Sequence, residues 1–324
     1  MLNFKEMYEL GIRMGKEADP RGAQRVKEYL DRVKKDYENL KLADKAYFED
    51  ERLVNPYFDD CRMHTGDPKA PIKRILAGID ADAGEVLLAT QLNERGKKID
   101  AVVVHHPVGG SLATLNGVMD MVVEVYEELG VPVHLAEKYM EERITEVGRG
   151  IHPYNHYQVI DMARLLGVNL MNMHTPTDNL VNVFLTDFLN KRKPKTVGDV
   201  MDALMEIPEY QEAKRRGNGP VIFAGSPKNK VGKFVLEMTG GTEPSSKIYS
   251  ELSRSGISTV IGMHMQKDAR EKANEHSLNV VVAGHMSSDS LGMNLYLDEL
   301  EKKGVEIVPC GGLIRVSRTK KNNI

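Results

Sequence analysis

The residues best suited to chemistry are three groups of imidazole and carboxylate side chains, each at the end of an apolar run. In the first group, His105 and His106 follow the run at 101–104 and precede Pro107. Neutral imidazole is the commonest side-chain ligand of transition metals, so two histidines at a strand end indicate a metal site. The pair alone is equally compatible with a structural role, in which Pro107 merely ends the strand.

The second and third groups share one spacing, a histidine followed four residues later by an aspartate. They are His174 with Asp178, and His285 with Asp289. If the chain enters a helix at the third group, His285 and Asp289 share one face and converge on one ion. The alternative is a satisfied turn histidine beside an acidic helix N-terminus.

A turn and a cap are expected around the third group. Gly284 permits a tight turn before a helix, and Ser287 or Ser288 is the expected N-cap residue. Three strand ends that each carry potential ligands make a shared metal site a better explanation than coincidence.

The elements that position these groups are alternating strands and helices. Runs rich in Val and Ile are typical of buried parallel strands, and ligands gather beyond the carboxyl ends of such strands. Residues 1–60 are charged and helical in pattern, and helices are also expected at 118–129 and 157–166. The expected strands are 75–79, 101–104, 131–135, 170–173, 221–224, 234–238, 258–261, 279–282 and 313–316. This alternation predicts an α/β fold.

The chain is long enough for two lobes. Its 324 residues, 41% of them hydrophobic, exceed one comfortable core. We expect a first α/β lobe with an N-terminal helical extension at residues 1–192 and a second α/β lobe at 193–324. The C-terminal segment can pack back on the first lobe. The predicted architecture is therefore two lobes of mixed α/β layers, with the metal site in the cleft between them.

The three groups together resemble one family. The order His-His-Pro, His-Thr-x-x-Asp and Gly-His-x-x-x-acid, with the earlier turn at 66–67 and the strand end at 79–80, is similar to the NGG-interacting-factor-three-like dinuclear metal family. The resemblance runs from about Val26 to the carboxyl terminus. Bacterial members are labelled GTP cyclohydrolase 1 type 2 homologues. The resemblance implies a homo-oligomer, commonly a hexamer, and these metal ligands: His105, His106, Asp178, His285 and Asp289.

The chain departs from the family pattern near its last motif. Asp289 stands where the family usually has Glu, and its side chain is one methylene shorter, so the coordination mode can differ. The family's Thr-Gly-Glu is replaced by the segment 261–264, which ends in His264. His264 either replaces the lost acid or is a packed or solvated residue. The segment after Asp178 is also shortened, which affects the expected substrate specificity more than metal binding.

Such a ligand set favours hydrolysis. Structural zinc sites are usually closed and rich in Cys, whereas this chain has only Cys61 and Cys310. Histidine and carboxylate ligands with open positions suit Zn, Mn, Fe or Co. The family resemblance implies two such divalent ions per subunit. In two-metal hydrolases a carboxylate such as Asp178 joins ions about 3.5 to 4 Å apart, and a metal lowers the pKa of bound water to about 7.

His174 is the candidate catalytic residue. The family holds it close to the metals, which implies that it orients a ligand, takes a proton or binds substrate. Orientation of a ligand is the preferred role. We expect a metal-dependent hydrolase of a small, nucleotide-like molecule, although the residues themselves do not select GTP. The alternative is a non-catalytic regulatory or scaffold protein that binds metal through the same residues.

Composition excludes several other classes of protein. The net charge is −3 and the basic runs are short, which argues against general nucleic-acid binding. No apolar stretch approaches the roughly 20 residues that span a bilayer, and no secretory segment is evident, so a cytoplasmic location with reduced thiols is expected. The segment 240–242, Gly-Gly-Thr, is either a simple turn or an anion-binding nest.

Overall fold

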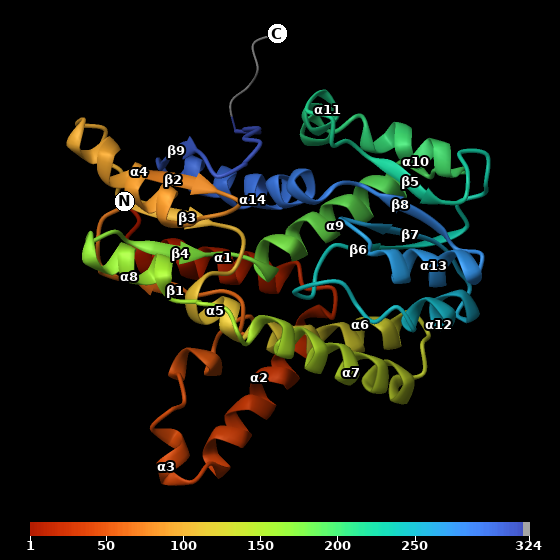
Figure 1. Cartoon of the computed structure of the whole chain (residues 1–324), viewed down its shortest axis with the longest axis horizontal. Coiled ribbons are helices and arrows are strands. Elements are labelled where there is room, and N and C mark those ends of the chain that lie inside the picture. Colours follow the sequence, from red (N-terminus) through yellow and green to blue (C-terminus); the bar gives the residue numbers. More distant parts are fainter. Residues whose placement is uncertain (320–324) are drawn as a thin grey trace.

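The structure is a computed structural model of the chain and describes residues 1–319; residues 320–324, at the end of the predicted second lobe, lie outside the described residues. Two mixed sheets lie side by side along the long axis, with helices packed around them (Figure 1). The predicted α/β class is confirmed. The boundary between residues 192 and 193 stays a prediction.

The first sheet has the strand order β1-β4-β3-β2-β9. Four of its strands are parallel, and β1 runs antiparallel to β4 at one edge. The last strand, β9, pairs with β2, so the C-terminal part of the chain returns to the first sheet. The strands are β1 (Met63–Thr65), β2 (Arg74–Gly78), β3 (Ala101–Val104), β4 (Leu170–Asn172) and β9 (Glu306–Pro309).

The second sheet has the order β5-β8-β7-β6 and repeats this plan. Three strands are parallel, and β5 runs antiparallel to β8 at the edge. The strands are β5 (Val221–Ala224), β6 (Lys233–Glu237), β7 (Ile257–Gly262) and β8 (Asn279–Val282). One hydrophobic cluster contains buried residues from both sheets, such as Val103 and Val260, so the two halves share a core.

The helices cover the sheets, except that α2 and α3 project from the body (Figure 1). No helix within residues 1–319 is both long enough and apolar enough to cross a membrane. The helices before β4 are α1 (Phe4–Glu17), α2 (Gly22–Asn39), α3 (Leu42–Lys45), η1 (Asp50–Leu53), α4 (Ala83–Glu94), α5 (Gly109–Ala113), η2 (Leu115–Asp120), α6 (Met121–Glu128), α7 (Val133–Ile151) and α8 (Gln158–Leu165). Those after it are α9 (Thr175–Arg192), α10 (Val197–Leu204), α11 (Pro208–Arg215), α12 (Ile248–Arg254), α13 (Lys267–Glu275) and α14 (His285–Lys302).

Two predicted strands are wrong. The segment 131–135 enters α7, because Pro132 occupies the N-cap position and its carbonyl accepts hydrogen bonds from the amides of Leu135 and Ala136. The fixed φ of proline suits a helix start, and this outweighed the β-branched residues around it. The segment 313–316 forms no strand.

The predicted serine cap of α14 is also wrong. The helix begins at His285, and Gly284 is the N-cap residue with φ 113°, a conformation that favours glycine. Ser287 and Ser288 lie in the first turn, where their hydroxyls donate to the carbonyl of Gly284 at 3.2 and 2.6 Å. The turn therefore starts the helix three residues earlier than the serines suggested.

Helices α9 and α14 pack against each other between the two sheets (Figure 1). A Cβ atom at Gly292 of α14 would lie 2.3 Å from the carbonyl oxygen of Thr177 in α9, so only glycine permits this approach. Because α9 follows β4 and α14 follows β8, their N-terminal turns come together beside the end of β3.

Candidate metal centre

Asp289, in the first turn of α14, lies among three histidine rings. Its Oδ1 is 3.6 Å from Nε2 of His105, and its Oδ2 is 3.4 Å from Nε2 of His106. The same Oδ2 is 3.5 Å from Nε2 of His285, one helical turn earlier. One carboxylate thus joins residues from the first sheet to residues from the second.

Asp178, in the first turn of α9, completes the cluster. Its Oδ1 is 3.4 Å from Nε2 of His105, and its Oδ2 is 3.8 Å from Nε2 of His174. All six residues singled out from the sequence therefore come together. That they bind metal stays a prediction.

The spacing of these atoms suits shared metal ligands better than hydrogen bonds. Strong N–H···O bonds are 2.7–3.2 Å long. Two ligand atoms held 2.0 to 2.2 Å from one tetrahedral ion lie about 3.4 Å apart. Three sets of side chains offer ligand atoms within 4.8 Å of one another: His105, His106 and His174; His106, His285 and Asp289; His105, Asp178 and Asp289.

The carboxylate oxygens lack hydrogen-bond partners although they are buried. Asp289 is 1% exposed and neither of its oxygens has a partner, and Asp178 is 4% exposed with an unpartnered Oδ1. Burial of an uncompensated carboxylate is costly unless a cation or a proton neutralises it. A divalent cation supplies that charge, so the residues fit a metal ion.

The electrostatics of the cluster lead to the same conclusion. Burial, followed by the charges of Asp289 and Asp60, raises the pKa of Asp178 well above its usual value. Burial, followed by the neighbouring histidines, lowers the pKa of His105 well below its usual value. A cation favours both the ionised carboxylate and the neutral imidazole, which are the forms that ligate metals.

His106 differs from His105. Burial alone lowers its pKa, but the nearby carboxylate of Asp289 and then the hydrogen bond with Asp80 raise the pKa to about 9. Its Nδ1 lies 2.7 Å from Oδ1 of Asp80. The expected strand end at 79–80 therefore contributes to the site through Asp80.

Three of the histidines are fixed by the ring nitrogen that faces away from the two aspartates. Such contacts orient metal-binding imidazoles, which present the other nitrogen to the ion. The Nδ1 contacts are Thr177 Oγ1 for His105 at 2.9 Å, Asp80 Oδ1 for His106 at 2.7 Å, and Asp60 Oδ2 for His174 at 2.8 Å.

Asp60 was missed by the sequence reasoning. It is fully buried, and its Oδ2 also accepts a hydrogen bond from the hydroxyl of Thr175 at 2.6 Å. It precedes β1 and belongs to no motif, so no local signal points to it. Only the tertiary structure brings it behind His174.

His264 lies beside the cluster but in none of the three ligand sets. Its ring centroid is 4.8 Å from that of His285, and it lines the neighbouring cavity. Asp289 approaches three histidines and belongs to two of the ligand sets, whereas Asp178 approaches two histidines and belongs to one.

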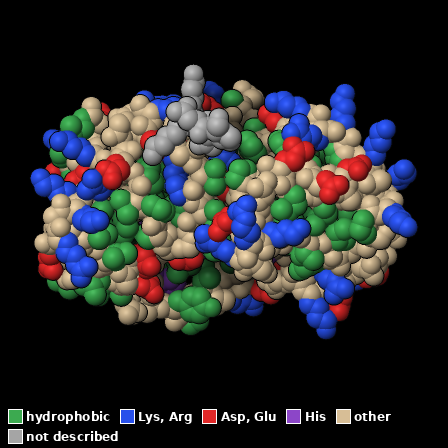
Figure 2. Space-filling view, turned by 90° about the horizontal axis from the view of Figure 1, so that it is seen from above, with side chains coloured by type: hydrophobic (Ala, Val, Ile, Leu, Met, Phe, Trp, Pro, Cys, Tyr) green, Lys and Arg blue, Asp and Glu red, His purple; other side chains and the backbone are tan. Residues whose placement is uncertain are grey.

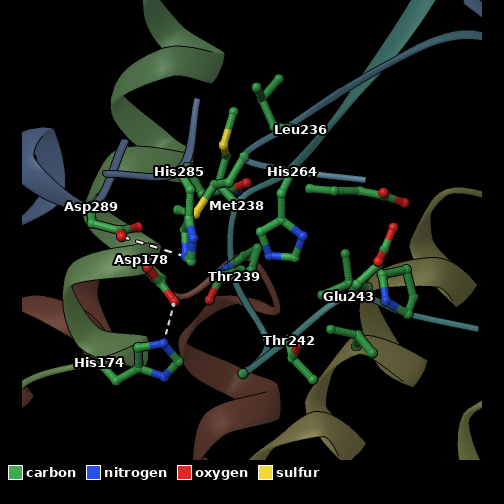
Figure 3. Close-up of a pocket in the computed structure, with 18 of the residues that line it drawn as sticks. His174, Asp178, Leu236, Met238, Thr239, Thr242, Glu243, His264, His285 and Asp289 are labelled. Carbon is green, nitrogen blue, oxygen red and sulfur yellow. Dashed lines mark ion pairs between the residues drawn. The ribbon is translucent and has the colours of Figure 1, made fainter. Parts of the chain in front are cut away.

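The cluster opens into a cavity (Figure 3). The cavity extends from the two aspartates to the ends of β6 and β7, and its walls include Tyr126, Leu236, Glu237, Met238, Thr242 and Glu243.

The fold is similar to that of known structures. A NIF3 superfamily protein from Sphaerobacter thermophilus is 28% identical, with a TM-score of 0.70 over 79% of this chain and 92% of that one. Reduced HcgD from Methanocaldococcus jannaschii is 15% identical, with a TM-score of 0.48 over 78% and 88%. A Bacillus cereus protein related to NIF3 is 13% identical, with a TM-score of 0.39 over 78% and 90%. No protein-family model and no curated protein sequence matches the chain.

Proposed function

Because this chain belongs to the NIF3 superfamily, we propose that it is a metal-dependent hydrolase that acts on a small, nucleotide-like molecule. Two divalent ions, Zn, Mn, Fe or Co, occupy the cluster in this proposal. Their ligands are His105, His106, Asp178, His285 and Asp289.

The bound ions would supply a water of lowered pKa, about 7 instead of 15.7, as a nucleophile at neutral pH. The protein's own residues set up that chemistry. Asp289 joins the two sets of ligands, and Asp178 and His105 are the buried ligands. His174 orients Asp178, and Asp60 holds the ring of His174. His285 is the most open member, with 39% of its side chain exposed, so substrate approaches on its side.

One observation carries the proposal. The unpartnered oxygens of Asp178 and Asp289 belong to residues that line a cavity. A purely structural ion is usually enclosed by four protein ligands, whereas catalytic sites keep a position open to water and substrate. The open side of this cluster supports a catalytic role over a structural one.

The test is hydrolysis by the metal-loaded protein of phosphoester, nucleotide and amide substrates. The variant His106→Ala is expected to lose more than about a hundredfold in rate, because loss of an outer partner alone costs 10 to 100-fold. His134→Ala, which removes an exposed histidine at the start of α7, is the matched control. Activity that survives His106→Ala contradicts the proposal. Metal binding without hydrolysis of any substrate favours the regulatory alternative.

We also propose that the chain assembles as a homo-hexamer. The proposal comes from the family resemblance. Light scattering coupled to size-exclusion chromatography tests it, and a mass other than six chains contradicts it.

A further inference from the structure

The cavity beside the metal centre has an acidic far end. Among the described residues that line it there is no Lys or Arg, whereas Glu237 and Glu243 both belong to its wall. Figure 3 shows Glu243 on the opposite side of the cavity from Asp289. A molecule that reaches from the metal centre to the far end therefore meets carboxylates there.

Glu237 ends β6 and is held by two tyrosines. The hydroxyl of Tyr249 donates to its Oε2 at 2.9 Å, and the hydroxyl of Tyr126 donates to its Oε1 at 3.3 Å. Burial raises the pKa of Glu237 to about 7 against the lowering effect of both tyrosines, and Glu243 raises it further. An additional donor or cation at this carboxylate is thus favourable.

Glu243 is also buried, at 7% exposure. Its Oε1 accepts a hydrogen bond from the amide of Gln266 at 2.8 Å, which fixes the carboxylate in the cavity wall. The guanidinium of Arg143 donates to the backbone carbonyl of Glu243 at 3.0 Å and pairs with Glu146. Burial raises the pKa of Glu243 despite Arg143.

An independent observation points to a ligand in this cavity. Asn182, one turn after Asp178 on α9, is 9% exposed and lines the cavity, yet its Oδ1 has no hydrogen-bond partner. A buried amide oxygen without a partner is costly unless a ligand or a water satisfies it. This acceptor and the two glutamates together call for a ligand that donates hydrogen bonds.

The glycine-rich turn at 240–242 does not form a site for an anion. The amide of Thr242 already donates to the carbonyl of Gly240 at 3.1 Å, which fits a simple turn better than an anion-binding nest. The cavity wall also includes the apolar side chains of Val122, Leu236 and Met238. An aromatic or aliphatic body fits against them.

We infer that the cavity takes a substrate with an apolar or aromatic body whose end remote from the metals carries a cationic N–H donor group, an amidinium or a protonated amine. Which end reacts rests on the proposed function. An anionic group at the remote end would face two buried carboxylates at low dielectric, where like charges repel strongly.

The test is binding, which is independent of turnover. Benzamidine, benzamide and benzoate share one size and shape but differ in charge, and their affinities for the full chain are measured by titration calorimetry after metal removal by a chelator. Benzamidine is expected to bind at least about tenfold more tightly than benzoate, because a hydrogen bond to a charged group contributes 1.5–3 kcal/mol. Glu243→Gln should reduce that preference at least about tenfold, and Glu137→Gln, an exposed acid on α7, should leave it unchanged.

A second variant guards against misfolding of the first. Glu237→Gln keeps the shape of the side chain, and both tyrosine hydroxyls can still pair with it, so it should lower benzamidine affinity while benzamide affinity stays constant. Equal affinity for benzoate and benzamidine, or an unchanged preference in both variants, overturns the inference. Benzamidine binding without hydrolysis of any substrate would leave the cavity assignment standing and count only against the proposed hydrolase.

Discussion

The two helices that meet at the candidate metal centre begin alike but are held differently. Helix α9 follows β4 and α14 follows β8, and each starts with a histidine and an aspartate four residues apart. His174 is 7% exposed, and Asp60 fixes its ring. His285 is 39% exposed and borders the cavity. The same spacing therefore gives one enclosed pair and one open pair.

The aspartates of the two pairs, Asp178 and Asp289, differ in how many histidines they approach. Asp178 approaches two histidines, whereas Asp289 approaches three. The neighbouring strands differ too, because β3 is followed by two histidines, whereas β7 is followed by Met263 and His264. The local motif places a side chain at a helix start, and contacts from elsewhere in the fold determine what that side chain can do.

The largest effect that sharpens this comparison is expected at Asp60. Asp60→Asn removes the charge behind His174, and loss of such an outer partner typically lowers metal affinity about 10 to 100-fold. Competition with a fluorescent chelator measures this affinity. Asp36→Asn, an exposed change on α2, should have no effect. Wild-type affinity in a folded Asp60→Asn protein would mean that the enclosed pair needs no support from Asp60.

The second largest effect is expected from a substitution where α9 and α14 cross. Seven residues after each histidine stand Val181 in α9 and Gly292 in α14, and these positions face each other. Gly292→Ala forces its Cβ against the backbone of Thr177, so the free energy of unfolding should fall by about 1 to 3 kcal/mol. Urea denaturation measures this change.

Gly150→Ala in α7 is the control for that prediction. Nothing lies within 4 Å of a Cβ added there. The change should be neutral or stabilise by up to about 1 kcal/mol, because alanine is the better helix former. Equal effects of the two alanines would show that the helices do not cross as closely as the structure indicates.

The smallest effect is expected at His264. Because it belongs to none of the ligand sets, His264→Ala should change metal affinity by no more than about twofold, the scale of substitutions away from special features. The same chelator competition applies. A loss as large as that of Asp60→Asn would place His264 among the ligands and make the second helix start as well supported as the first.

Much of the fold could be predicted because its parallel strands are short, buried and apolar. The runs at 101–104, 221–224 and 279–282 coincide with β3, β5 and β8. The strand predicted at 131–135 was wrong because β-branched residues such as Val favour strands only when they pack in a sheet. Pro132 starts a helix there instead.

The grouping of the candidate ligands could be predicted because they stand at strand ends and at helical spacing. Asp60 and Glu243 could not, since neither lies in a motif and each acts only through residues that are distant in the sequence. The face seen in Figure 2 carries both Lys or Arg and Asp or Glu side chains.

The most direct test of the metal centre is metal content per chain, measured by elemental mass spectrometry after reconstitution with Zn, Mn, Fe or Co. The wild type should hold about two ions. Asp289→Asn, which alters both ligand sets joined by that carboxylate, should lose more metal than Asp178→Asn, and Asp187→Asn, an exposed change on α9, should lose none. An absence of bound metal in the wild type, or equal content in all four proteins, would contradict the account.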